Sequence, residues 1–134
     1  MNKILFVCKH NVFRSRVAEA FFNKFNKNKN YIASSAGLLP GRYPLDELQV
    51  KVANKFGIDI NGIPQAITIH LLEQTNLMII VADNVPSEIF KNEKYGREEI
   101  VWKIKDDNCS GAEETYEIIK KIENKVKKFV KGLK

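Results

Sequence analysis

Short, wholly apolar runs alternate along this chain with longer segments of helical periodicity, and that alternation constrains the fold more than any other feature. Lys3–Cys8 and Leu77–Ala82 are nearly continuous apolar runs, which are typical of parallel strands buried on both faces. Tyr31–Ala36 and Glu99–Ile104 predict two further strands. Because strands that alternate with helices form parallel sheets with helices on both faces, we expect an α/β three-layer sandwich. We expect residues 1–134 to form one domain.

Apolar residues at helical spacing predict the helices between these strands. The expected helices are Ser15–Asn26, Leu45–Phe56, a short segment Ile67–Gln74, another short helix that starts at Pro86, and Ala112–Lys131. In the second helix, Leu48, Val52 and Phe56 are expected to face the core, and Gly57 ends it. Ser15 stands where it could cap the first helix, with an acidic residue, Glu19, in the first turn.

The charge balance is basic, with a net charge of +6. The excess cations lie in residues 1–30 and 115–134, and the middle of the chain is acidic. A basic chain can indicate nucleic-acid binding, but the phenylalanines near the N-terminal cations keep the spacing of a core and not of a stacking surface. The apolar runs are too short for a membrane span or a signal peptide. We therefore expect a cytoplasmic protein with no nucleic-acid and no membrane partner.

The segment Cys8-Lys9-His10-Asn11-Val12-Phe13-Arg14-Ser15 is a Cys-x5-Arg-Ser loop between the first strand and the first helix. Ligands of such sheets bind at the carboxyl ends of strands, where this loop lies. A loop that wraps into a helix N-terminus directs several backbone N–H groups at one point, so it can bind a tetrahedral oxyanion and stabilise a thiolate on Cys8. Arg14 supplies a planar fork for two oxyanion oxygens, and Ser15 can donate a hydrogen bond to the thiolate.

These residues predict a cysteine nucleophile below a bound phosphoryl group, held by the residues from Lys9 to Ser15. Lys9 and Arg16 could steer the anion toward it. Taken singly, Cys8 could be a buried apolar residue at the end of a strand, Arg14 a surface cation and Ser15 a helix cap. Their combination at this place in the fold indicates function.

The chain resembles the low-molecular-weight protein tyrosine phosphatases, and the related thioredoxin-coupled arsenate reductases, over nearly its whole length. The resemblance rests on Val7-Cys8, Asn11, Arg14-Ser15 and Ala18-Glu19-Ala20-Phe21 at the start, and on Ser34–Gly37, Gly57–Ile60 and Leu77–Asp83 further on. It implies a four-stranded parallel sheet of flavodoxin-like order 2-1-3-4. It also implies hydrolysis of a phosphotyrosine protein or a small phosphomonoester through a phosphocysteine, without metal or cofactor. Asn11 would hold the strained loop by hydrogen bonds.

The resemblance further implies a general acid after the fourth strand, usually in an Asp-Pro pair. Asp106 lies four residues beyond Trp102, which matches that acid, and Asp107 then stands where Pro is usual. Counting back from Gly111 favours Asp107 instead. We expect Asp106 to protonate the leaving oxygen and then to serve as base for water. The alternative is that both aspartates cap the last helix or face solvent.

Several positions depart from the family pattern. His10 stands where phosphatases usually have Gly, and it either borders the pocket mouth or points to solvent. Asn108 and Cys109 occupy places where many relatives carry aromatic residues that grip a phenyl ring. Tyr43 is therefore a candidate for one aromatic wall of the pocket.

Arsenate reduction is the main alternative function. The thioredoxin-coupled reductases use two further cysteines after the third strand, and the segment Ala82–Ser87 has none. A variant that uses glutathione, or one that uses Cys109, remains open and would need a thiol reductant as partner. Cys109 could also form a protective, reversible disulfide with Cys8, or be inert. A phosphocarrier protein of similar fold is a further alternative, against which the Arg14-Ser15 pair and the acidic pair argue.

Overall fold

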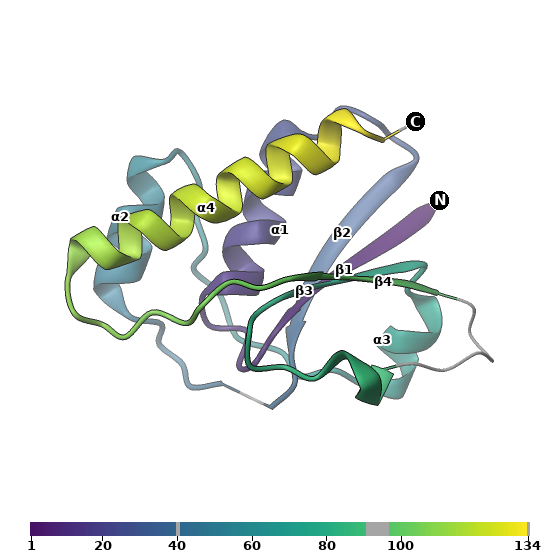
Figure 1. Ribbon diagram of the computed structural model, residues 1–134, viewed down its shortest axis with the longest axis horizontal. Coiled ribbons are helices and arrows are strands. Elements are labelled where there is room, and N and C mark those ends of the chain that lie inside the picture. The colour runs from purple at the N-terminus through teal and green to yellow at the C-terminus, as the bar shows by residue number, and fades with distance from the viewer. Residues whose placement is uncertain (40, 91–96, 134) are drawn as a thin grey trace.

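A computed structural model describes residues 1–39, 41–90 and 97–133, and these residues form a four-stranded sheet between two layers of helices (Figure 1). The elements follow in the order β1 (Asn2–Cys8), α1 (Arg14–Phe25), β2 (Tyr31–Gly37), α2 (Glu47–Lys55), α3 (Ile69–Gln74), β3 (Leu77–Val81), the 3-10 helix η1 (Ser87–Phe90), β4 (Glu98–Trp102) and α4 (Ala112–Lys131). Neighbouring strands are all parallel, in the order β2-β1-β3-β4. The predicted α/β sandwich and its strand order are confirmed.

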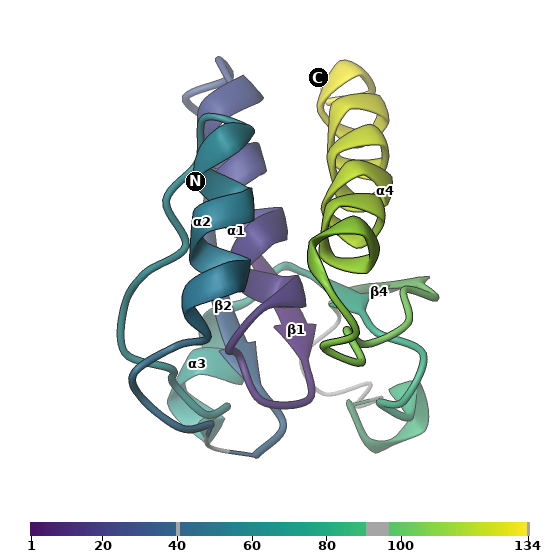
Figure 2. The ribbon, with the colours of Figure 1, turned by 90° about the vertical axis from the view of Figure 1, so that its left-hand side faces the viewer.

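The central strand β1 contributes side chains to both faces of the sheet. Ile4 and Phe6 join the core beneath α1 and α4, whereas Leu5 and Val7 join a second core beside α3. In the first core the ring of Phe6 lies 6.0 Å from that of Phe22, centroid to centroid. Figure 2 shows α1 and α2 beside α4 on one side of the sheet. Burial of both faces explains why this strand is apolar without alternation.

The second helix differs in detail from its prediction. Asp46 is the N-cap of α2 and accepts a hydrogen bond from the backbone N–H of Gln49 at 3.0 Å, so the helix begins two residues later than expected. Leu48 was expected in the core, but its side chain is 39% exposed and the neighbouring Gln49 is buried instead. Gly57 follows the helix with a φ of +79°, a conformation that glycine adopts without steric cost.

The long helix α4 has the bounds that its periodicity predicted. Its buried face includes Ile118, Ile119 and Ile122, and lysines such as Lys120 lie on its exposed face. Those lysines make the helix too polar for a bilayer. Over residues 1–39, 41–90 and 97–133, no helix combines the length and the apolar character that crossing a membrane requires.

Candidate active site

The anion loop, residues 8–15, joins the carboxyl end of β1 to the start of α1. The Sγ of Cys8 is buried and lies 3.0 Å from the Oγ of Ser15. From His10 to Ser15, no backbone N–H group donates to a protein acceptor among the described residues. Such free N–H groups at a helix N-terminus form an anion-binding site. The loop therefore brings a thiol and a set of unpaired donors together, as the sequence predicted.

Asn11 organises the anion loop from within. Its Nδ2 donates to the Oγ of Ser15 at 2.8 Å and to the Oγ of Ser35 at 3.0 Å, and its Oδ1 accepts from the backbone N–H of Gln65 at 2.9 Å. Because a backbone N–H can only donate, this last bond fixes which end of the amide faces Ser15. The Ser15 hydroxyl thus accepts from Asn11 and keeps its own proton for a hydrogen bond to the Cys8 sulfur.

Three side chains near the anion loop have contacts other than those predicted. Ser15 lies inside α1, which has no side-chain cap, and its hydroxyl belongs to the Asn11 network. Glu19 lies beyond the first turn and accepts a hydrogen bond from the Oγ of Ser35 at 2.6 Å. The Nε of Arg16 donates to the carbonyl of Ile60 at 2.6 Å, and its role in steering an anion stays a prediction. Sequence reasoning missed the role of Ser35, whose only signal was its place in the family resemblance.

The glycine strap, residues 37–39 and 41, holds the outer side of the anion loop. The backbone N–H of Leu38 donates to the carbonyl of Cys8 at 3.0 Å. A Cβ on Gly37 would lie 2.6 Å from the carbonyl carbon of His10, and one on Gly41 would overlap the same residue. Any larger residue at these positions would therefore displace the loop. Sequence reasoning did not predict this contact.

Arg14 closes the anion loop on the side of β3 and β4. Its side chain is 2% exposed, Nη1 donates to the carbonyl of Ile104 at 2.8 Å, and Nη2 donates to the Oδ1 of Asn84 at 3.0 Å. The carboxylates of Asp83 and Asp106 lie 3.6 and 3.5 Å from the guanidinium. These contacts compensate a buried charge and fix the plane of the fork. Neither Asn84 nor Asp83 was predicted at the site, although Asp83 ends a segment that carries the family resemblance.

The acid loop, residues 105–111, follows β4 and gives its two aspartates different surroundings. Asp106 is 49% exposed and faces Arg14. Asp107 is tied to two helices, since its Oδ2 accepts from the Nε2 of Gln49 at 3.0 Å and from the Oγ1 of Thr115 at 2.7 Å. Asp107 thus holds the acid loop in place, whereas the Oδ2 of Asp106 points toward Arg14 of the anion loop.

Glu114 of α4 holds the acid loop from the other side. It accepts from the Nζ of Lys105 at 2.8 Å and from the backbone N–H of Asn108 at 2.7 Å. These hydrogen bonds, that of Lys105 first, lower the pKa of Glu114 to about 2. The same pairing raises the pKa of Lys105.

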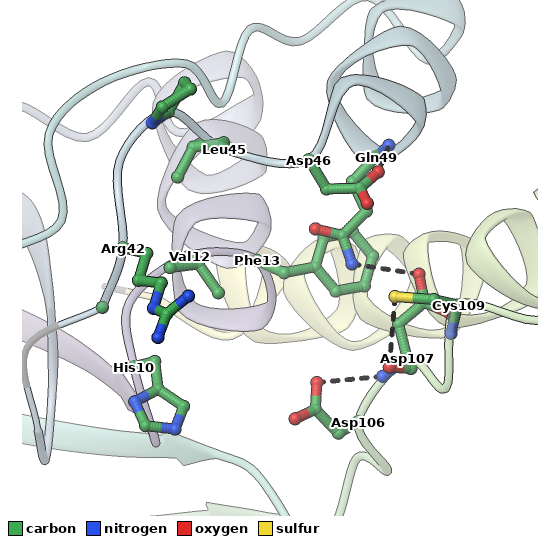
Figure 3. A pocket seen from close by; sticks show the side chains of 12 residues that line it. His10, Val12, Phe13, Arg42, Leu45, Asp46, Gln49, Asp106, Asp107 and Cys109 are labelled. Carbon is green, nitrogen blue, oxygen red and sulfur yellow. Dashed lines mark hydrogen bonds between the residues drawn. The ribbon is translucent and has the colours of Figure 1, made fainter.

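A cavity of about 420 Å³ opens between the anion loop and the acid loop (Figure 3). Its lining includes His10, Val12 and Phe13 of the anion loop and Asp106, Asp107 and Cys109 of the acid loop. His10 therefore borders the mouth, which is one of its two predicted positions. Tyr43 was expected as an aromatic wall, but it is 57% exposed and is absent from the described lining, to which its neighbour Arg42 contributes. The backbone of this loop turns the arginine, and not the tyrosine, toward the cavity.

Cys109 is the second free thiol of the site. It is exposed and has a φ of +59°. Partial desolvation, followed by the charges of Asp107 and Asp46, raises the pKa of this thiol, so it is a weak nucleophile at neutral pH. Its disulfide with Cys8 remains a prediction. In the part of the chain that the structure describes, no cluster of three or more His, Cys, Asp or Glu side chains could hold a metal.

Fold and site together define an α/β protein with a cysteine in an oxyanion-binding loop. A sequence model of the low molecular weight phosphotyrosine protein phosphatase family matches residues 3–134, and the chain belongs to this family.

Solved structures with the same fold carry several functional names. The arginine phosphatase YwlE of Bacillus subtilis is 18% identical, with a TM-score of 0.82 over 96% of this chain and 93% of that chain. The low molecular weight protein tyrosine phosphatase of T. tengcongensis is 22% identical, with a TM-score of 0.83 over 99% and 100%. The arsenate reductase of Archaeoglobus fulgidus is 24% identical, with a TM-score of 0.74 over 96% and 98%. At these identities the likeness concerns the fold alone.

Proposed function

We propose that the chain hydrolyses phosphate monoesters, with phosphotyrosine in proteins as the main substrate class, through a phosphocysteine on Cys8. The observation that carries this proposal is the 3.0 Å contact between Cys8 and Ser15 inside the anion loop. The N–H groups from His10 to Ser15 have no protein acceptor among the described residues, so they are available to a phosphoryl group. Its phosphorus would then face the sulfur.

The reaction takes two steps. The Cys8 thiolate attacks phosphorus, the bond from phosphorus to the ester oxygen breaks, and Asp106 gives that oxygen a proton. Water then attacks the phosphocysteine, Asp106 takes a proton from it, and the sulfur–phosphorus bond breaks to release inorganic phosphate. Arg14 and the loop amides hold the equatorial oxygens, where charge is spread in the transition state. Asp106 suits the acid role better than Asp107, whose carboxylate is engaged by Gln49 and Thr115.

The nucleophile is tested with p-nitrophenyl phosphate and a phosphotyrosine peptide. Cys8→Ser should lower kcat by at least about four orders of magnitude, because a serine hydroxyl without a base is a poor nucleophile. Cys109→Ser, the matched change at the other cysteine, should retain most of the turnover. Mass spectrometry of acid-quenched wild-type protein should detect phosphate on the peptide that contains Cys8. Steady turnover by Cys8→Ser protein would refute the scheme.

A parallel assay with arsenate as substrate separates a phosphatase from an arsenate reductase. With thioredoxin or glutathione regeneration, we expect no arsenate-dependent oxidation of the reductant, since residues 82–87 contain no cysteine and Cys109 has a raised pKa. We propose that residues 1–134 act as one phosphatase domain. A reducing compartment such as the cytoplasm would keep the Cys8 thiol free.

Phosphoarginine is a second candidate substrate, favoured by the lining of the cavity. Asp46, Asp106 and Asp107 line it, while Phe13, the one Phe, Tyr or Trp in the described lining, is only 1% exposed. A guanidinium leaving group carries positive charge that carboxylates attract, whereas a phenyl ring finds no exposed aromatic partner there. One solved structure of this fold is named an arginine phosphatase. Matched phosphotyrosine and phosphoarginine peptides, compared by kcat/KM, decide between the two.

A further inference from the structure

The mouth of the cavity has two walls of opposite charge. Figure 3 shows His10 and Arg42 close together on one side, the basic wall, and Asp46, Asp106 and Asp107 on the other, the acidic wall. His10 belongs to the anion loop, and the other residues of both walls lie outside the loop that would hold the phosphoryl group. They therefore face the part of a substrate next to the ester.

Protein groups already engage the carboxylates of the acidic wall. Asp46 accepts the cap hydrogen bond of α2, and Asp107 accepts from the side chain of Gln49 at 3.0 Å. Asp106 lies 3.5 Å from Arg14. Each of these carboxylates thus already has a partner within the protein.

Arg42 of the basic wall has no such partner. The guanidinium groups of Arg14, Arg16 and Arg97 donate to backbone carbonyls. Arg42 is exposed, and within the described residues it takes part in no hydrogen bond and no ion pair. Its five N–H donors are thus available, and their fork matches a carboxylate.

The backbone next to Arg42 is fixed relative to the anion loop. A Cβ on Gly41 would overlap the carbonyl oxygen of His10 and the side chain of Val12, so residue 41 packs directly on the loop. Arg42 is therefore anchored beside the mouth, although its side chain lies in solvent.

We propose that Arg42, with His10 beside it, binds a carboxylate of the substrate, so that the preferred substrates are phosphotyrosine peptides with Asp or Glu next to the phosphotyrosine. This inference rests on the proposed function and specifies its substrate class. The bound carboxylate occupies the basic wall, while the ester oxygen faces Asp106 across the mouth. The carboxylate compensates the free charge of Arg42 and adds charge-assisted hydrogen bonds.

Three peptides test the proposal, identical except that the residues flanking phosphotyrosine are Glu, Gln or Lys. For the wild-type protein we expect kcat/KM to be about five- to tenfold higher with Glu than with Gln, and lower still with Lys. Arg42→Gln should bring the ratio of Glu peptide to Gln peptide close to one, and Arg42→Lys should restore part of it. Lys125→Gln, a matched charge removal on the exposed side of α4, should leave the ratio unchanged. Added salt should lower the wild-type ratio.

Binding of the same peptides to Cys8→Ser protein, followed by fluorescence anisotropy, gives the ratio without turnover. Equal values for the Glu and Gln peptides, or a ratio that survives Arg42→Gln, would overturn the inference even if p-nitrophenyl phosphate is hydrolysed normally. Failure of the proposed function looks different, because Cys8→Ser would then keep its turnover. Hydrolysis of p-nitrophenyl phosphate without binding or hydrolysis of any peptide would also overturn the inference.

Discussion

The anion loop and the acid loop are both needed for the proposed reaction, but the protein holds them in opposite ways. In the anion loop, Asn11, Arg14 and Ser15 are at most 2% exposed and bond to several distant segments. In the acid loop, Asp106 and Cys109 are exposed, and side chains of the loop and of neighbouring helices fasten it. Stabilising transition-state charge requires donors fixed in advance, whereas a proton donor must reach different leaving oxygens and exchange with water. Changes in the two loops should therefore have different consequences.

After Cys8→Ser, the largest effect should come from the buried cation of the anion loop. Arg14→Lys keeps the charge but loses the planar fork, and its ammonium cannot satisfy Ile104 and Asn84 while holding two phosphoryl oxygens. We expect kcat/KM for p-nitrophenyl phosphate to fall about a thousandfold. The affinity for inorganic phosphate, measured as an inhibitor, should fall with it. A loss of less than tenfold would mean that Arg14 only supports the fold.

The next effect concerns the exposed acid and should depend on the leaving group. Asp106→Asn should lower kcat about a hundredfold for phenyl phosphate, and far less for dinitrophenyl phosphate, whose phenolate leaves without a proton. Asp107→Asn removes no proton donor in this scheme. It should therefore lower kcat less, and by a similar factor for both esters. If instead Asp107→Asn shows the leaving-group dependence, the acid assignment must move to Asp107.

Asn11→Ala should cost stability more than activity. It removes the partner of Ser15, Ser35 and the Gln65 N–H, and it places Ala at a φ of +56°. Unsatisfied buried groups and this backbone conformation together cost about 3 kcal/mol of unfolding free energy, measured in urea. Displacement of the loop should lower kcat/KM about tenfold. Asn11→Gly isolates the hydrogen bonds, since glycine tolerates the conformation, and it should recover about 1 kcal/mol.

The sequence was sufficient for much of the fold and for the residues of the anion loop. The strands follow from apolar runs, and α4 has the bounds that its periodicity predicted, because burial acts on neighbouring positions along the chain. The nucleophile, Arg14 and Ser15 lie within one loop, so their spacing could be recognised without knowledge of the fold.

The distant partners of that loop could not be predicted in the same way. Gln65 and Asn84 meet the anion loop only after the sheet has formed, and no local pattern marks them. Arg42 and Tyr43 are neighbours in an irregular loop, where no periodicity indicates which side chain faces the cavity. The aspartate pair was ambiguous for a similar reason, since Gln49 and Thr115, which engage Asp107, come from two other elements.

The smallest effect should come from the ion pair between Glu114 of α4 and Lys105 of the acid loop. The pKa of Glu114 is lowered from an ordinary value of 4.5 to about 2, so the folded state binds its proton less tightly than the unfolded state does. The stabilisation of the folded state by ionised Glu114 is thus complete above about pH 4.5, and it is lost as the pH falls toward 2. Glu114→Gln should lower Tm slightly at pH 7, and the difference from wild type should shrink through that window. Both partners are near the surface, so high salt should reduce the difference as well.

A matched variant separates this ion pair from a general effect of charge on α4. Glu117 lies on the same helix, is exposed, and forms no hydrogen bond or ion pair within the described residues. Glu117→Gln should therefore change Tm little, and by a similar amount across the same pH range. A Glu114→Gln difference that persists unchanged to pH 2 would show that Glu114 contributes through packing and not through its charge.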